Sequence, residues 1–337
     1  MYRLIIFFAA ALSLCAQDPR GTITGQVTDT SGAVVPGVSV RATNLETNVA
    51  AAAVSNAQGA YEIPYLLPGR YKVDAELAGF KGFSLSPVEL RTGERIRLDV
   101  SLAPGDVKEV MQVTAQATVL EAATATVSQV MSSRQVSELP LRSGSVAFLF
   151  NMAPGVIMTA LPYDGPWNID QASNISVGGG GAQSADFNID GVNNNGKGGS
   201  TSFVPPPDMV QEVRVEANSY DSAVGHTTGG SINITLKSGT NRLHGSIGVS
   251  VASGPMLTRN FFSNKFIFDP TTGPITPEKI KANTPSSRWL RESATAGGPV
   301  YLPKLYDGRN KSFWMFGYQS HNRRRPLAAS QTVPTEA

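Results

Sequence analysis

The stretch Tyr71-Lys72-Val73-Asp74-Ala75-Glu76-Leu77 alternates strictly between apolar and polar side chains. Because successive side chains of a β-strand point to opposite faces of the sheet, this period of two predicts a strand with one face in a core and the other in water. Residues 95–102 repeat the pattern, with apolar side chains at Ile96, Leu98, Val100 and Leu102. This part of the chain is therefore expected to consist of half-buried strands.

Turn-forming residues separate these strands. They cluster at Asp29–Gly32, Asn56–Gly59, Pro68-Gly69 and Thr92-Gly93. Glycine reaches positive φ, proline fixes φ, and the short polar side chains bond to their own backbone, so such clusters favour turns. About seven short strands at this spacing predict an immunoglobulin- or transthyretin-like β-sandwich. We place it at residues 21–103.

Four motifs within this segment occur in a recognisable order: Gly25-Gln26-Val27-Thr28-Asp29, Val35-Pro36-Gly37-Val38, Gly59-Ala60-Tyr61 and Leu67-Pro68-Gly69-Arg70-Tyr71. In these motifs the segment resembles the carboxypeptidase regulatory-like domain. The resemblance implies an accessory or spacer domain and not a peptidase. The segment contains no histidine and thus no zinc-binding His/Glu pair.

The N-terminus has the layout of a secretory signal peptide, which we place at residues 1–16. Arg3 precedes an apolar run from Leu4 to Leu14, which is too short to span a bilayer. A buried N-terminal strand or helix is the alternative. Cys15 follows a lipoprotein-like box, but Leu14 stands where a small residue is expected, so we expect ordinary cleavage near Ala16. The mature chain then has no cysteine, which excludes disulfides and a thiol nucleophile.

The composition limits the partners. The formal net charge is +2, so no strong field would draw the chain to nucleic acid. No other apolar stretch reaches the length of a membrane-spanning helix. If the mature protein enters a membrane, it is therefore expected to do so as β-strands.

Residues 128–240 combine helix and strand signals and predict an α+β domain. Ser132 and Gln135 form a capping-box pattern before a short helix that should end near Pro140. A second helix from Ser143 to about Met152 would bury Val146, Leu149 and Phe150. The expected strands are Ala185–Asp190, Glu212–Ala217 and Ser231–Lys237.

From residue 241 onward the chain alternates again. Ile247, Val249 and Val251 form one apolar row, Trp314, Phe316 and Tyr318 form another, and Arg288–Val300 is a further candidate strand. Alternating segments of about ten residues with aromatic ends are typical of membrane β-barrel strands. The polar stretch Gly254–Ser287 is long enough for an external loop. A continued soluble β-domain is the alternative.

Three near-matches to chemical motifs fail. Asp186-x-Asn188-x-Asp190-Gly191 begins like a calcium loop but has Lys197 where a bidentate Glu is needed. Gly191 to Lys197 resembles a phosphate-binding loop, but Gly198 replaces the Ser or Thr that would hold magnesium. The histidines, at positions 226, 244 and 321, lack acidic or cysteine ligands at metal spacing. We predict no catalytic residues, no metal, no cofactor and no enzyme.

A second resemblance covers most of the mature chain. It is carried by Phe187-Asn188-Ile189-Asp190-Gly191-Val192-Asn193, Val210-Gln211-Glu212-Val213, Ala217-Asn218-Ser219-Tyr220, Gly229-Gly230-Ser231-Ile232-Asn233, Lys237-Ser238-Gly239-Thr240-Asn241, His244-Gly245-Ser246, Arg259-Asn260-Phe261-Phe262, Gly297-Gly298-Pro299-Val300 and Lys311-Ser312-Phe313-Trp314. With these motifs the chain resembles the TonB-dependent receptors that carry a regulatory-like domain (Oar-like proteins). The resemblance implies an outer-membrane location with the regulatory-like domain in the periplasm.

The same resemblance implies a plan for the chain. Residues 104–127 become a linker with a possible TonB box, residues 128–240 a plug domain within the barrel, and residues 241–337 the start of a transmembrane β-barrel. The fold class is thus mainly β. The implied partners are the inner-membrane protein TonB, outer-membrane lipid and an unknown extracellular ligand, without nucleic acid.

Two sets of site residues follow. The TonB-box candidate comprises Glu109, Val110, Met111, Gln112, Val113, Thr114 and Ala115. This segment is expected to be extended and able to pair as a strand. From the residues alone, an ordinary linker or sandwich edge is the competing interpretation. The ligand-contact candidates lie on plug loops and comprise Gly178, Gly179, Gly180, Gly181, Asn193, Asn194, Asn195 and Gly196. Such loops also serve packing and turns.

The expected function is energised uptake of a large or scarce nutrient. The alternative is a secreted adhesion or surface-assembly module without transport. The resemblance implies a barrel of about 22 strands, and the roughly three strands expected here cannot close such a barrel. We therefore expect this sequence to be the N-terminal part of a longer protein or of a prematurely ended gene.

Overall fold

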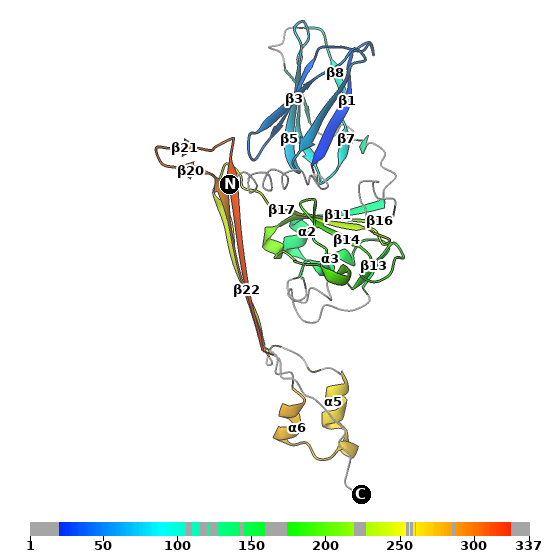
Figure 1. Ribbon diagram of the computed structural model, residues 1–337, viewed down its shortest axis with the longest axis vertical. Helices are drawn as coiled ribbons and strands as arrows, with labels where there is room; N and C mark the ends of the chain where they lie inside the picture. The colour runs from blue at the N-terminus through cyan, green and yellow to red at the C-terminus, as the bar shows by residue number, and fades with distance from the viewer. Residues whose placement is uncertain are drawn as a thin grey trace, which may run out of the picture. The chain divides into compact units, whose positions relative to one another are not determined.

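The computed structural model describes residues 20–105, 110–114, 120–121, 127–139, 141, 145–158, 174–218, 227–253, 256, 259, 261–284 and 288–324. The predicted signal peptide lies outside these residues. The chain divides into two compact units, Met1–His244 with Gly297–Met315 and Gly245–Ala296 with Phe316–Ala337. Strands predominate (Figure 1), which confirms the mainly β fold class.

The first domain is a sandwich of two sheets. One sheet has the order β10-β7-β1-β4, with β8 also paired to β1, and the other has the order β3-β2-β5-β6-β9. The strands of the first sheet are β1 (Gly21–Asp29), β4 (Ala60–Leu66), β7 (Arg95–Arg97), β8 (Val100–Leu102) and β10 (Leu120–Glu121). Those of the second are β2 (Ser39–Asn44), β3 (Ala50–Val54), β5 (Gly69–Glu76), β6 (Gly82–Leu90) and β9 (Val110–Thr114).

The alternation seen in the sequence forms the core of this domain. Tyr71, Val73 and Ala75 of β5 are buried, as are the predicted apolar positions from Ile96 to Leu102. The stretch 95–102 is nevertheless two strands. At the break, the main-chain N–H of Leu98 donates to Thr24 and its carbonyl accepts a bond of 2.6 Å from the Tyr61 hydroxyl. The backbone groups of Leu98 are thus satisfied outside a regular ladder.

Gly25 allows β1 to approach this break. A Cβ at position 25 would lie 2.6 Å from the carbonyl carbon of Leu98 and would overlap its oxygen. Real Cβ atoms essentially never come that close. A side chain here would therefore separate β1 from the segment between β7 and β8, which explains the glycine that opens the first motif.

The second domain is a five-stranded sheet in the order β11-β16-β17-β14-β15. Its strands are β11 (Val127–Ser132), β16 (Val210–Asn218), β17 (Ser231–Leu236), β14 (Asp186–Ile189) and β15 (Val192–Asn193). The hairpin between β14 and β15 turns at Asp190-Gly191, where both residues have positive φ, as a two-residue hairpin with primed turn geometry requires. A separate pair is formed by β12 (Val156–Met158) and β13 (Ile175–Val177).

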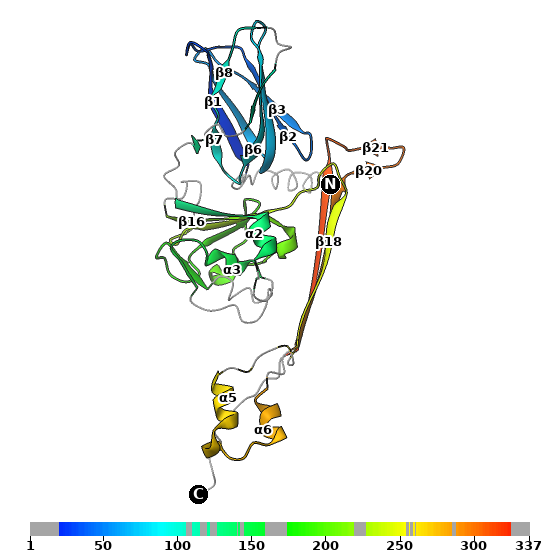
Figure 2. The same ribbon diagram turned by 180° about the vertical axis from the view of Figure 1, so that it is seen from behind.

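Two helices, α2 (Ser133–Glu138) and α3 (Ala147–Phe150), cover one face of this sheet (Figure 2). The predicted capping box is confirmed, since Ser132 and Gln135 bond reciprocally across the first turn of α2. Helix α3 is shorter than the predicted span from Ser143 to Met152. Its core side chains, Leu149 and Phe150, are buried as expected. Two 3₁₀ turns, η2 (Lys197–Gly199) and η3 (Pro207–Met209), complete the domain.

Three longer strands follow, β18 (His244–Ala252), β19 (Arg288–Pro299) and β22 (Phe313–Arg324), in the sheet order β18-β19-β22. A small hairpin joins β20 (Tyr301–Leu302) and β21 (Tyr306–Asp307). The apolar rows predicted for β18 and β22 are exposed, Ile247 by 89% and Phe316 by 57%. Exposure of a whole row is unusual for a strand face packed against a protein core.

The stretch predicted as an external loop contains helices α5 (Phe261–Phe268) and α6 (Pro277–Ala282) with a 3₁₀ turn, η5 (Pro270–Thr272). The apolar residues of α5 are not gathered on one face of the helix, and within α5 only Ile267 is buried. Within the described residues, no helix has the length and apolar character needed to cross a membrane.

Candidate functional site

The predicted TonB box forms a strand on the edge of the sandwich. Five of its seven residues, Val110–Thr114, make up β9, whereas Glu109 and Ala115 lie outside the described residues. Strand β9 runs parallel to β6, with Val110 opposite Gly82 and Thr114 opposite Ser86. The segment therefore has the extended backbone that a TonB box or a sandwich edge requires, and in this structure it pairs with the sandwich.

The linker is attached to the other sheet as well. Leu120 and Glu121 form β10, which pairs antiparallel with Arg97 and Ile96 of β7. The chain thus adds one strand to each sheet of the sandwich before it enters the second domain at β11. The sequence predicted an extended segment at Glu109–Ala115 but no strand at Leu120–Glu121. It carried no signal for the strands with which either segment pairs.

The turn at Thr92 connects the sandwich to the second domain, and both belong to the same compact unit. Its main-chain N–H donates to the Glu212 carboxylate, and its carbonyl accepts a bond of 2.7 Å from Nη1 of Arg214. Its hydroxyl lies 2.6 Å from the hydroxyl of Thr235. Every polar group of Thr92 is therefore bonded to β16 or β17. We call Thr92, Glu212, Arg214 and Thr235 the joint.

The joint contains a buried acid. Glu212 is 6% exposed, and burial raises the pKa of its carboxyl group to about 7. The Thr92 N–H bond, followed by the charges of Arg91 and Arg214, opposes this rise. Sequence reasoning missed the joint, because Thr92-Gly93 looked only like a turn. The charges that alternate with apolar residues along β16 were the available signal.

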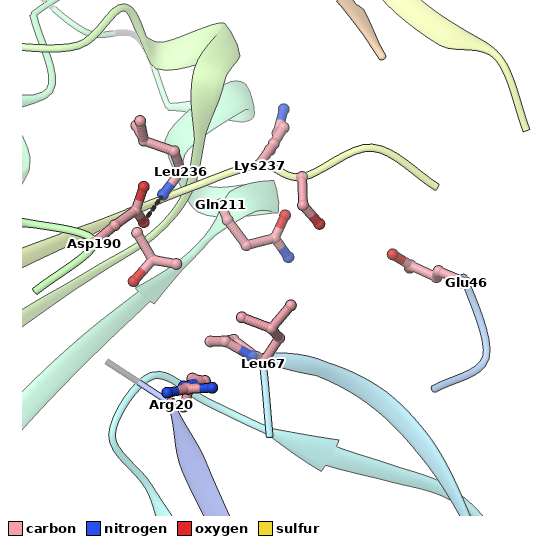
Figure 3. Close-up of a pocket in the computed structure, with 10 residues that line it drawn as sticks. Arg20, Glu46, Leu67, Asp190, Gln211, Leu236 and Lys237 are labelled. Carbon is pink, nitrogen blue, oxygen red and sulfur yellow. Dashed lines mark hydrogen bonds between the residues drawn. The ribbon is translucent and has the colours of Figure 1, made fainter. Parts of the chain in front are cut away.

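A cavity of about 440 Å³ lies beside the joint (Figure 3). Its lining combines sandwich and second-domain residues and carries both charge signs: Arg20, Glu46, Leu67, Pro68, Asp190, Gln211, Thr235, Leu236, Lys237 and Ser238. Asp190 accepts a 2.9 Å bond from the main-chain N–H of Leu236, so its carboxylate is already engaged in the wall. The lining shows no nucleophile paired with a base.

The predicted ligand-contact asparagines are held by internal bonds. The buried Asp186 carboxylate accepts hydrogen bonds from the side-chain amides of Asn188, Asn193 and Asn195, at 2.8, 3.0 and 2.9 Å. Asn194 donates to the carbonyl of Phe203 and accepts from its N–H. These side chains therefore fix the conformation of the loop that contains Gly196.

The predicted glycine loop Gly178–Gly181 combines two roles. Gly178 and Gly179 have positive φ, and Gly179 borders open space. A Cβ at Gly180, in contrast, would lie 2.5 Å from the Cα of Gly229. The loop thus packs closely against a second glycine segment through Gly180 and leaves Gly179 and Gly181 open to the outside.

No group of three or more His, Cys, Asp or Glu side chains lies close enough to hold a metal ion in the described part of the chain. His226 lies outside that part. Nδ1 of His244 is 2.9 Å from the carbonyl oxygen of Arg242, and the His321 ring packs edge-on against Trp289. His244 thus lies beside a main-chain carbonyl group, and His321 lies beside an aromatic ring.

Sequence families match the two ends of the chain. Residues 22–103 match the carboxypeptidase regulatory-like domain, and residues 235–337 match an outer membrane beta barrel domain. The chain is also 29% identical over 238 residues to the TonB-dependent transporter Oar of Myxococcus xanthus. That alignment covers 67% of this chain and 21% of the relative, so the chain spans about a fifth of the length of the curated protein it matches.

Solved structures give partial similarities. The siderophore receptor PirA from Pseudomonas aeruginosa is 17% identical, with a TM-score of 0.36 over 53% of this chain and 26% of that chain. PirA from Acinetobacter baumannii is 16% identical, with a TM-score of 0.36 over 58% and 24%. No functional conclusion follows from structural similarity of this extent.

The domain families and the Oar relative agree with the motifs that the sequence displays. They confirm the resemblance drawn from those motifs and the outer-membrane location that it implied. These comparisons support the identification of the chain as part of a TonB-dependent receptor of the outer membrane.

Proposed function

We propose that the chain takes part in TonB-energised uptake of a large or scarce nutrient, without enzymatic activity. In this proposal the sandwich lies in the periplasm, residues 128–240 act as the plug, and TonB binds the segment Glu109–Ala115. The observation that carries the proposal is β9, because this segment supplies main-chain hydrogen bonds to a sheet edge. Strand addition of this kind is how extended peptide segments bind partner sheets.

The plug loops Gly178–Gly181 and Asn193–Gly196 are proposed to contact the ligand. Because the asparagine side chains are bonded within the loop, contact would come through loop shape and main-chain groups. The open surfaces at Gly179 and Gly181 support this proposal.

Proline and alanine at the same position test the TonB proposal. Proline lacks the N–H that a strand donates, whereas alanine keeps it. Receptor carrying Gln112→Pro should no longer be captured by the periplasmic domain of TonB, and Gln112→Ala should be captured as well as the unmodified receptor. Equal capture of all three proteins would exclude this segment as the TonB box. It would leave the adhesion or assembly alternative to be tested next.

A further inference from the structure

Strand β9 is the edge strand of the sheet β3-β2-β5-β6-β9, and its neighbour in this sheet is β6. Five consecutive residue pairs are in register, from Gly82 with Val110 to Ser86 with Thr114. Strand β6 is a firm template for this pairing, because Phe83 and Leu85 are buried in the sandwich core. The segment proposed to bind TonB therefore already has a strand partner within its own chain.

The order of elements along the chain gives this pairing a mechanical consequence. Strand β10 lies between the box and the plug, and it is paired with β7 of the sandwich. The first plug strand, β11, follows after β10 and pairs with β16 through Ser132 opposite Glu212. A pull on β9 would thus load the sandwich first. The pulling force acts on β11 only after β9 has separated from β6 and β10 has separated from β7.

We propose that the sandwich is a latch for the TonB box: β6 holds the box as strand β9, and a productive TonB complex forms only when the box leaves β6. This inference rests on the proposed function. It adds that the regulatory-like domain controls access of TonB to its binding segment. Short edge pairings of this kind open at low cost compared with a domain core, so exchange between β6 and TonB needs no unfolding of the sandwich.

A disulfide between register partners tests the latch in the full-length receptor. Ser84 and Gln112 are opposite one another on β6 and β9. The sequence has a single cysteine, Cys15, within the predicted signal peptide, so Ser84→Cys with Gln112→Cys introduces a defined thiol pair. The matched control is Arg41→Cys with Ala52→Cys, a register pair of β2 and β3 that does not involve the linker.

Four measurements decide the outcome. The 84–112 disulfide should form under mild oxidation, and the periplasmic domain of TonB should slow its formation. Oxidised receptor should be captured by that domain at least about tenfold more weakly than reduced receptor, with recovery after reduction. The control pair should show no difference in capture between its oxidised and reduced forms.

Two results would overturn the latch: failure of the 84–112 disulfide to form, or equal capture of locked and reduced receptor. In the latter case the box is presented to TonB on the sandwich edge. Equal capture of the unmodified receptor and of a receptor that lacks Glu109–Ala115 would instead contradict the proposed TonB box, and the disulfide yield would still report on the pairing with β6. The two proposals therefore fail in different ways.

Discussion

Glu212 is an acid buried on the face of β16 opposite the helices. Its folded pKa of about 7 exceeds the ordinary value of 4.5, so the folded chain takes up a proton in this range. Because the folded chain holds this proton more tightly than the unfolded chain, the protonated carboxyl group stabilises the fold at low pH. As the pH rises from 4.5 through about 7, this stabilisation, which amounts to up to roughly 3 kcal/mol, is lost.

We predict that Glu212→Gln removes this pH dependence. The amide keeps an acceptor for the Thr92 N–H but cannot ionise, so the variant should be more stable than the unmodified chain at about pH 8 and similar to it at about pH 5. Urea unfolding at both pH values measures the difference. Thr235→Val is the control, since it weakens the same joint without changing a charge. A pH slope that survives in Glu212→Gln would contradict the assignment.

Gly25 is a position where the sandwich has no room for a side chain. We predict that Gly25→Ala lowers the free energy of unfolding by roughly 2–4 kcal/mol, because the added methyl group overlaps the carbonyl group of Leu98. Gly181→Ala meets open space and should change stability by less than about 0.5 kcal/mol. Equal stability of the two variants would show that β1 and the segment at Leu98 can separate without loss.

At the scale of elements, the hairpin of β14 and β15 depends on the Asp186 cluster. We predict that Asp186→Ala destabilises the second domain by roughly 2–4 kcal/mol, because three side-chain amides lose their acceptor. Asp186→Asn, which keeps one acceptor oxygen, should lie between this variant and the unmodified chain. Hydrogen exchange of the loop at Asn193–Gly196 should rise in the same order. Unchanged exchange in Asp186→Ala would assign the loop shape to other contacts.

Elements with a local cause were predictable from the sequence. The alternation at Tyr71–Leu77 identified a core strand, and Ser132 with Gln135 identified the start of α2, because each signal lies within one element. Helices α5 and α6 were missed, since the apolar residues of α5 are spread around the helix instead of forming one face and only Ile267 of α5 is buried. Only helices and strands with a clear pattern in their own sequence could therefore be predicted.

At the scale of the molecule, the unpredicted features join residues far apart in sequence. Thr92 and Glu212 are 120 positions apart, and no residue pattern indicates that a sandwich turn meets a strand of the second domain. The TonB-box segment was predicted to be extended, but its partner β6 depends on sheet topology. The candidate loops at Gly178–Gly181 and Asn193–Gly196 were located, whereas their internal bonds were not. Contacts between residues far apart in the sequence were thus not predictable from local patterns.

The central proposal is that TonB binds this receptor through the segment Glu109–Ala115. The most direct measurement is photocrosslinking in living cells, with a photoreactive amino acid at Gln112 of the full-length receptor and, as control, at Arg41 on the exposed side of β2. The account predicts an adduct with TonB from position 112 and none from position 41. Receptor that reaches the outer membrane yet gives no TonB adduct from position 112, or from the neighbouring positions of β9, would contradict it.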